Sequence, residues 1–221
     1  MRTLVIVPAD SCREDARSLR EEIGIWLPDA EVILTATERE GVVWALGHGH
    51  DAVIRWDAGA ACAHLLPDLL DALEDADLVV GDRGAARSGR CRRGWGPTRL
   101  ANALLRRLIG TDVRDVLSGV RASRTDALRR VHAIPLASDE SAVVELLHGA
   151  ERAGLRVAEV PLVRAGGVPS VGAGSPAPAI LRALLAASRV RRSSEPIPAT
   201  PVGARATIDT RTGTVPIPIP A

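Results

Sequence analysis

Short apolar runs alternate with helical segments over most of the first 163 residues, and this alternation limits the possible folds more than any other feature. The runs expected to form strands are residues 3–7, 31–35, 51–56, 77–80 and 156–163. Between them, apolar residues recur at helical spacing in residues 13–27, 65–73, 97–109 and 141–153. Strands that alternate with helices predict an α/β fold with a mostly parallel, doubly wound sheet.

The composition agrees with one globular domain followed by a different kind of segment. With 46% hydrophobic and 25% charged residues, the 221-residue chain can bury a sizeable core. We expect the fold core to end near Pro169, so that residues 1–169 form the domain. Residues 170–192 are expected to hold one further helix and a linker, and the Pro-rich residues 193–221 a disordered tail.

The charge balance and the cysteine count exclude several functional classes. The 28 basic and 27 acidic residues give a net charge of +1, so no overall field attracts nucleic acid, and no nucleic-acid partner is expected. The three cysteines show no CxxC spacing, which argues against disulfides and zinc and favours the cytoplasm. No stretch has the roughly 18–20 apolar residues of a transmembrane helix, and the N-terminus does not have the pattern of a signal peptide.

Five motifs, in order, resemble those of family 2 glycosyltransferases of the polyprenyl-phosphate (dolichyl-phosphate) mannose synthase type. Asp57-Ala58-Gly59 is similar to the family's Asp-Ala-Asp, and residues 76–83 (Ala-Asp-Leu-Val-Val-Gly-Asp-Arg) to its next strand. Residues 98–102 are similar to a family helix start, and residues 114–121 (Arg-Asp-Val-Leu-Ser-Gly-Val-Arg) to its Arg-Asp-Val-Thr-Ser-Gly-Phe-Arg. Residues 144–147 and 153–161 together resemble the family's Val-Glu-Leu-Leu and Ala-Gly-Leu-Arg-Val-Ala-Glu-Val-Pro.

This resemblance implies a fold and an activity. The implied fold is the GT-A fold of enzymes that use nucleotide-diphospho-sugars. The implied reaction is inverting transfer of a hexose from a nucleotide-sugar donor to a polyprenyl-phosphate-like acceptor, at the membrane surface and without a membrane span. A Mg or Mn divalent cation would neutralise the diphosphate as it leaves.

The same resemblance identifies the candidate site residues. Asp57 and Asp115 are the catalytic candidates, with Asp57 also the metal ligand; a helix N-cap is the alternative for Asp57. Asp115 is expected to orient Arg121 or to act as a general base. The candidates for substrate binding are Pro8, Asp10, Arg83, Arg99, Ser118 and Arg121. The three arginines would bind phosphates, although Arg83 and Arg99 could instead be solvated surface residues.

Other positions depart from the family pattern and favour a second hypothesis. Gly59 replaces the second acid of the Asp-Ala-Asp motif, Glu38 is what remains of an acidic motif after the second strand, and a phosphate-binding lysine is missing near Ser170. The chain could therefore be a catalytically degenerate relative that acts as a binding or regulatory module. His48, His50 and His64 lack a convincing metal-ligand pattern, and we expect them to be solvated, the first two in a loop.

Overall fold

The structure is a computed structural model that describes residues 1–9, 16–57, 63–83, 96–131, 141–162, 183–185 and 187. Its strands are β1 (Thr3–Pro8), β2 (Glu31–Thr35), β3 (Ala52–Arg55), β4 (Leu78–Asp82), β5 (Arg121–Arg124) and β6 (Val157–Pro161). Its helices are α1 (Ala16–Trp26), α2 (Glu38–His48), η1 (Ala63–Leu65), α3 (Leu66–Ala72), α4 (Gly96–Ile109), α5 (Thr125–Val131) and α6 (Ser141–Arg152). The five strands and four helices predicted within residues 1–163 are present among them, with bounds that differ by a few residues.

The six strands form one sheet in the order β2-β1-β3-β5-β4-β6. β1 pairs in parallel with β2 and β3, and β4 pairs in parallel with β6, so the predicted mostly parallel α/β sheet is confirmed. β5 was not predicted, and it runs antiparallel to both of its neighbours, β3 and β4. Its sequence, Arg-Ala-Ser-Arg, lacks the apolar run on which the prediction of strands relied.

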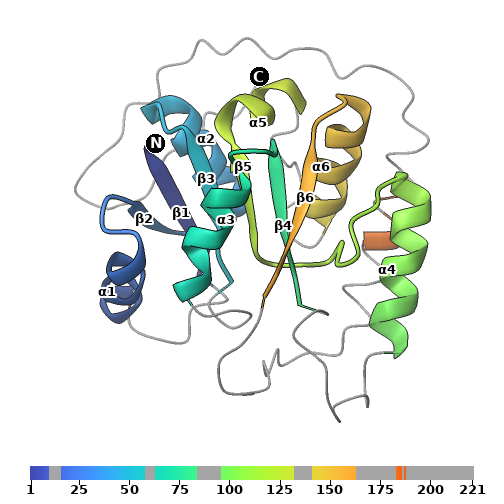
Figure 1. Ribbon diagram of the computed structural model, residues 1–221, viewed down its shortest axis with the longest axis horizontal. Helices are drawn as coiled ribbons and strands as arrows, with labels where there is room; N and C mark the ends of the chain where they lie inside the picture. Colours follow the sequence, from blue (N-terminus) through green and yellow to red (C-terminus); the bar gives the residue numbers. More distant parts are fainter. Residues whose placement is uncertain are drawn as a thin grey trace.

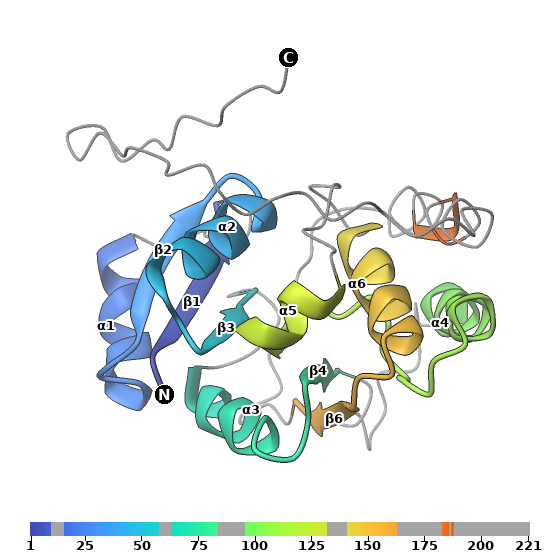
Figure 2. The same ribbon diagram turned by 90° about the horizontal axis from the view of Figure 1, so that it is seen from above.

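Helices cover both faces of the sheet (Figures 1 and 2). On one face, Leu4, Ile6, Val53 and Val80 pack with residues from α2, α4, α5 and α6. On the other face, a second cluster joins the sheet to α1, η1 and α3 and includes the buried Trp56. The result is a three-layer α/β/α domain with a core on each side of the sheet.

The helix α2 was also missed, because the segment that contains His48 was expected to be a loop. Thr37 is its N-cap, and the Thr37 side chain accepts a hydrogen bond from the backbone N–H of Glu40 at 3.3 Å. Gly49 ends the helix in the left-handed conformation, with φ of 69°. The Thr-x-x-Glu capping box and the following glycine are sequence signals that could have predicted this helix.

The apolar core extends beyond Pro169, further than the sequence predicted. Ala183 and Ala187 are buried in the cluster on the α2 side of the sheet, and residues 183–185 and 187 are helical. Residues 163–182 and 188–221, including the expected tail, lie outside the described residues. Residues 84–95 also lie outside the described residues, whereas Gly81 and Asp82 belong to the end of β4.

Candidate functional site

Charged side chains gather at the edge of the sheet formed by the carboxyl ends of the parallel strands. On the face that packs against α2 and α6, the strands are apolar at Ile6, Val53, Val80 and Val157. Because side chains alternate between the two faces of a strand, the next residues on this face are two positions further along. These residues are Pro8, Arg55, Asp82 and Glu159.

Arg121 joins this group because β5 is antiparallel. It is the first residue of β5 and pairs with Arg55 on one side and Val80 on the other. The start of β5, with the Ser118-Gly119 turn before it, therefore lies at the edge where the neighbouring strands end. In open α/β sheets ligands bind at this edge, so the geometry brings most of the predicted site residues together.

Asp115 is buried and holds Arg83 in a two-pronged ion pair. Arg83 Nε donates to Asp115 Oδ2 at 2.7 Å, and Arg83 Nη2 donates to Asp115 Oδ1 at 2.8 Å. Arg83 Nη2 also donates to the carbonyl oxygen of Leu117 at 2.8 Å. The side chain of Arg83 remains 29% exposed, so part of the guanidinium reaches the solvent. Asp115 thus orients Arg83, and not Arg121 as the sequence suggested.

The loop that contains Asp115 is held from α4 and from β6. Asn102, on α4, donates from Nδ2 to Asp115 Oδ1 at 3.2 Å and accepts from the backbone N–H of Leu117 at 3.3 Å. Glu159, on β6, accepts from the backbone N–H groups of Arg114 and Asp115 at 2.6 and 3.1 Å through one oxygen, Oε1. Residues that are far apart in the sequence therefore fix the loop next to Arg83.

A second cluster of charges forms around Glu38, at the start of α2. Arg121 forms an ion pair with Glu38 through two guanidinium nitrogens, Nε at 3.1 Å and Nη2. Arg55 Nε lies 3.3 Å from Glu38 Oε2, and Arg55 Nη1 donates to the carbonyl oxygen of Gly119 at 2.5 Å. The Arg121 side chain is only 4% exposed, so Arg121 contributes charge from beneath the surface of the site.

Burial and neighbouring charges shift the pKa values of three of these groups. Burial lowers the pKa of Arg121 to about 10, and the charge of Arg55 adds to this effect while Glu38 opposes it. Burial also lowers the pKa of Arg83, but the hydrogen bond and charge of Asp115, with the charges of Asp57 and Asp82, outweigh it, so that the pKa of Arg83 is raised overall. Burial raises the pKa of Glu159, and Asp82 adds to this, against the two backbone hydrogen bonds.

Asp57 follows β3 and is closely packed against the Ser118-Gly119 turn. A Cβ atom added to Gly119 would lie 2.8 Å from Asp57 Oδ2 and 3.0 Å from Arg55 Nη1. Only glycine fits this position without displacing a neighbour, because Cβ contacts below 3.0 Å essentially never occur. The turn therefore helps to fix the Asp57 carboxylate, which is half-buried and close enough to Arg83 to affect its pKa.

The other predicted residues have varied surroundings. Pro8 is buried at the end of β1, at the same edge. The buried Ser118 hydroxyl donates to the Val120 carbonyl at 3.2 Å and accepts from its N–H at 3.3 Å, so it shapes the turn. Asp10 lies outside the described residues, and Arg99 is in the first turn of α4, with its side chain also outside them.

The expectation about the histidines was wrong in two respects. His48 is the last residue of α2 and not part of a loop. His50 is 3% exposed and therefore not solvated. Its Nε2 lies 3.0 Å from Oε2 of Glu31, the first residue of the edge strand β2. These contacts lie at the start of β2, at the opposite end of the sheet from the candidate site, and they are structural.

The described residues do not form a complete protein-only metal site. They contain no group of three His, Cys, Asp or Glu side chains that could hold a metal ion. Residues 58–62, directly after Asp57, contain no acid. Asp57 nevertheless suits a cation that a diphosphate brings with it, because Mg²⁺ is commonly held by one or two carboxylates together with substrate phosphates.

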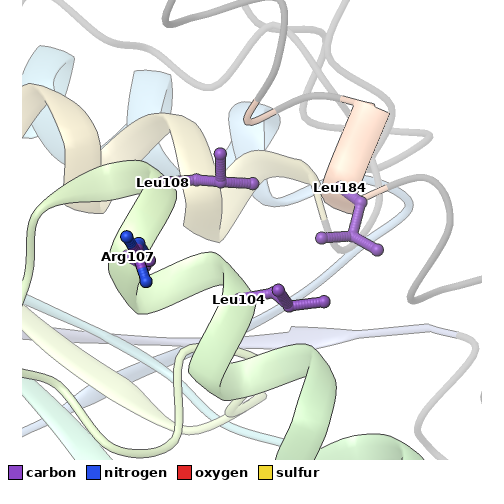
Figure 3. Close-up of a pocket in the computed structure, with 4 residues that line it drawn as sticks. All are labelled: Leu104, Arg107, Leu108 and Leu184. Carbon is purple, nitrogen blue, oxygen red and sulfur yellow. The ribbon is translucent and has the colours of Figure 1, made fainter.

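A separate apolar pocket lies between α4 and the segment that contains Leu184 (Figure 3). It has a volume of about 370 Å³ and is lined by Leu104, Arg107, Leu108 and Leu184, none of which was a predicted site residue. Leu100 and Leu104 on the same helix are 63% and 44% exposed. None of the helices in the described part of the chain has the length and apolar character needed to cross a bilayer.

The sequence reasoning missed four residues of the site as the structure arranges it. Arg55 was read only as part of a strand, and Glu38 only as a displaced carboxylate. Asn102 and Glu159 were each noted as part of a motif without a role. A charged residue two positions after an apolar residue, at the end of a predicted strand, is the signal that could have found Arg55 and Glu159.

Comparison with known proteins gives related sequences with named activities, although no protein-family model matches the chain. It is 35% identical over 132 residues to an undecaprenyl-phosphate mannosyltransferase of Micrococcus luteus, an alignment that covers 55% of this chain and 52% of the relative. It is 28% identical over 174 residues to a polyprenol monophosphomannose synthase of Mycolicibacterium smegmatis, covering 72% of this chain and 65% of the relative. The chain thus spans about half to two thirds of the length of these relatives.

Solved structures give the same fold. Glucosyl-3-phosphoglycerate synthase of Mycobacterium tuberculosis, in complex with Mn²⁺, UDP-glucose and phosphoglyceric acid, superposes with a TM-score of 0.57 at 21% identity, over 86% of this chain and 79% of that chain. Its complex with phosphoglyceric acid gives a TM-score of 0.54 at 22% identity, over 84% and 79%. The chain is therefore similar in sequence to polyprenyl-phosphate mannosyltransferases over part of their length, and it has the GT-A fold of these solved structures.

Proposed function

We propose that the protein transfers a hexose from a nucleotide-diphospho-sugar to a polyprenyl-phosphate-like acceptor. The observation that supports this best is the convergence of Asp57, Arg83 and Asp115 with the Ser118-Gly119 turn at the carboxyl edge of the sheet. Charged and polar groups from three separate segments, the ends of β3 and β4 and the loop before β5, meet there. The two sequence relatives, whose names describe mannosyl transfer to polyprenyl phosphates, support the same class of reaction.

In this proposal the arginines bind the phosphates. Arg83 is partly exposed and held in a fixed orientation by Asp115, so it can donate charge-assisted hydrogen bonds without first losing side-chain freedom. Arg121 is buried and adds positive charge from below. Arg99, which belongs to the first turn of α4, is proposed as a third phosphate-binding residue on the basis of its motif.

The reaction needs little acid–base chemistry from the protein. An oxygen of the acceptor phosphate forms a bond to the anomeric carbon as the bond from that carbon to the donor diphosphate breaks, with inversion. Because a phosphate is already anionic near neutral pH, its oxygen needs no strong base. Asp115, which is fully engaged with Arg83 and Asn102, is therefore proposed to position groups and not to remove a proton.

Asp57 is proposed to hold a Mg²⁺ or Mn²⁺ ion together with the donor diphosphate. When bound, such a cation would stabilise the negative charge that develops on the leaving diphosphate. Asp57 is suited to this role because its carboxylate is closely packed against Gly119 at the strand end. Its contact with the turn also links the metal ligand to the segment that leads into β5.

Contact with the membrane surface is proposed for the outer face of α4. This helix contains Arg99, Arg106 and Arg107 and has no acidic residue, while Leu100 and Leu104 are exposed. Exposed leucines beside arginines are typical of helices that lie on anionic lipid surfaces. Flotation with vesicles that contain anionic lipid, compared with purely zwitterionic vesicles, tests this part of the proposal; equal or absent binding would contradict it.

The decisive experiment is a transfer assay with UDP- and GDP-hexoses and a polyprenyl-phosphate acceptor. We expect hexose transfer that requires Mg²⁺ or Mn²⁺ and falls at least about a hundredfold in Asp57→Asn, given what a single charge-stabilising group can contribute to the rate. Calorimetry with UDP and GDP, with and without the metal, separates binding from turnover. If no donor is bound or consumed under any of these conditions, the proposed function is wrong.

The second candidate function is a binding or regulatory module that has lost catalysis. It is favoured by Gly59, which stands where the Asp-Ala-Asp motif would have its second acid, and by the lack of a three-ligand metal cluster in the described part of the chain. Such a protein would bind a nucleoside diphosphate in the calorimetric experiment and yet transfer no hexose. The two candidates therefore give different results in the same pair of assays.

A further inference from the structure

Glu159 has no part in the function proposed above, yet it lies at the same edge of the sheet. It is on β6, two residues after Val157 on the face that packs against α6, and its carboxylate points to the loop that contains Asp115. Two consecutive backbone N–H groups, those of Arg114 and Asp115, donate to its Oε1 at 2.6 and 3.1 Å. It contacts this loop through the backbone, so the contact does not depend on which side chain stands at residue 114.

These contacts form a chain that ends at a phosphate-binding arginine. Glu159 fixes the backbone of Asp115, and the Asp115 side chain then binds Arg83 through both of its oxygens. Arg83 closes the network by donating to the carbonyl of Leu117, three residues after Arg114 in the same loop. A shift of the loop would therefore move both groups that Arg83 binds.

Glu159 is half-buried, which has a cost for a carboxylate. Its pKa is raised because burial and the nearby charge of Asp82 disfavour the carboxylate. The two backbone N–H groups compensate, since hydrogen bonds to a charged group stabilise more than those between neutral groups. A charged group kept in such a place indicates a requirement for a fixed loop, and the group that this loop fixes is Arg83.

We propose that Glu159 is a positioning residue that sets the orientation of the Arg83 guanidinium for phosphate binding, through the backbone of residues 114 and 115. This inference rests on the proposed function, because Arg83 must bind a diphosphate for its orientation to have an effect. Glu159 itself touches no substrate in this scheme. Its effect on the ligand is indirect and should vanish when Arg83 is removed.

A double-mutant cycle on ligand affinity tests this directly. The probe is UDP or GDP, whichever the wild-type protein binds, titrated by calorimetry into wild type, Glu159→Ala, Arg83→Ala and the double variant. We expect Glu159→Ala to weaken binding about tenfold, the size of a lost charge-assisted hydrogen bond. In the Arg83→Ala background, the same change should alter the affinity less than about twofold. Glu159→Gln, which keeps an oxygen that can accept both bonds, should bind as wild type does.

A matched control separates positioning from stability. Glu31, like Glu159, is a carboxylate on a strand, but it lies at the opposite end of the sheet. It accepts a hydrogen bond from the Trp44 indole and interacts with the His50 ring. Glu31→Ala should lower the free energy of unfolding while leaving the ligand affinity unchanged. If Glu159→Ala does not fold, Glu159→Asp, shorter by one methylene, replaces it in the cycle.

The outcomes distinguish this inference from the function on which it rests. If Glu159→Ala weakens binding equally with and without Arg83, or if Glu31→Ala weakens it as much, Glu159 does not act through Arg83 and the inference is wrong, although the proposed function stands. The same holds if Glu159→Gln fails to restore binding. If wild type binds neither nucleotide, the proposed function is overturned and this inference with it.

Discussion

Gly119 is the residue at which the packing of the site can be tested with a single methyl group. In Gly119→Ala the new Cβ would lie 2.8 Å from Asp57 Oδ2 and 3.0 Å from both Asp57 Cβ and Arg55 Nη1, against about 3.4 Å for ordinary contact. The groups it meets belong to two side chains, so we expect these to shift by several tenths of an ångström while the strands stay in place. Asp57 and Arg55 would then both leave their present positions.

Two quantities follow from this geometry. Overpacking of this kind costs about 1–3 kcal/mol in the free energy of unfolding, and we expect the lower half of that range because side chains can yield more easily than backbone. The loss of function should be larger, since a displacement approaching 1 Å in a reacting group can reduce a rate by about a hundredfold. Hexose transfer should therefore fall roughly tenfold to a hundredfold.

The assay compares denaturant unfolding with transfer kinetics in Gly119→Ala and in a control, Gly47→Ala. A Cβ at Gly47, inside α2, has no atom within 4 Å, so this variant should keep full activity and gain up to about 1 kcal/mol from its better helix propensity. If Gly119→Ala transfers hexose at the wild-type rate, the turn does not fix Asp57. If its stability and activity fall in parallel, the effect is general unfolding, and the argument from local packing fails.

Three further predictions concern charge. Asp57→Ala should reduce hexose transfer by at least about a hundredfold. The free energy of unfolding should change by less than about 1 kcal/mol, because a half-buried carboxylate at a strand end contributes little to packing; a loss of stability as large as the loss of activity would favour the capping role. Arg83→Ala should weaken nucleoside diphosphate binding by about 1.5–3 kcal/mol in calorimetry. Arg121→Ala should weaken binding too, and in addition it should lower the free energy of unfolding by about 3–5 kcal/mol, because Glu38 is left buried without its main partner. Arg129→Ala and Arg152→Ala, on outer helix surfaces, are the controls; an equal effect on binding would mean that only diffuse charge attracts the ligand. Burial, with the charge of Arg152, lowers the pKa of His148 below 6.5, so the unfolded chain binds the proton more readily and the free energy of unfolding should fall as the pH drops below 6.5. Unfolding curves of His148→Gln should lack this part of the pH dependence, and an unchanged pH dependence would contradict the assignment.

The parts of the fold that the sequence predicted are those with local apolar periodicity. β1, β2, β4 and α4 were recognisable because each buries a regular set of apolar side chains. β5 could not be recognised in this way, because Arg121 and Arg124 are stabilised by contacts with distant residues, Glu38 and the residues that follow α3 respectively. Its strand conformation depends on tertiary pairing with β3 and β4, which no short window of sequence contains.

The same distinction applies to the site. Motif resemblance identified Asp57, Arg83, Asp115, Ser118 and Arg121, and the structure brings these residues to one edge of the sheet. What the motifs could not predict is which charges pair with each other, since Arg121 and Glu38 are 83 residues apart in the sequence. Pairing depends on strand order, and the unexpected antiparallel β5 decides that Arg121 meets Glu38 while Asp115 is left to bind Arg83.

Because side chains alternate along β3, the site can assemble only when this strand pairs in its correct register. Arg55 and Asp57 face the charged edge, while Trp56 between them is 1% exposed in the core on the other face. A slip of one residue in the pairing of this strand would send Trp56 into the charged cluster and bury Arg55 and Asp57 among apolar side chains. Such a misaligned chain would lose core packing and ligand binding in the same step, so the strong preference of Trp56 for the core also protects the site against assembly in the wrong register.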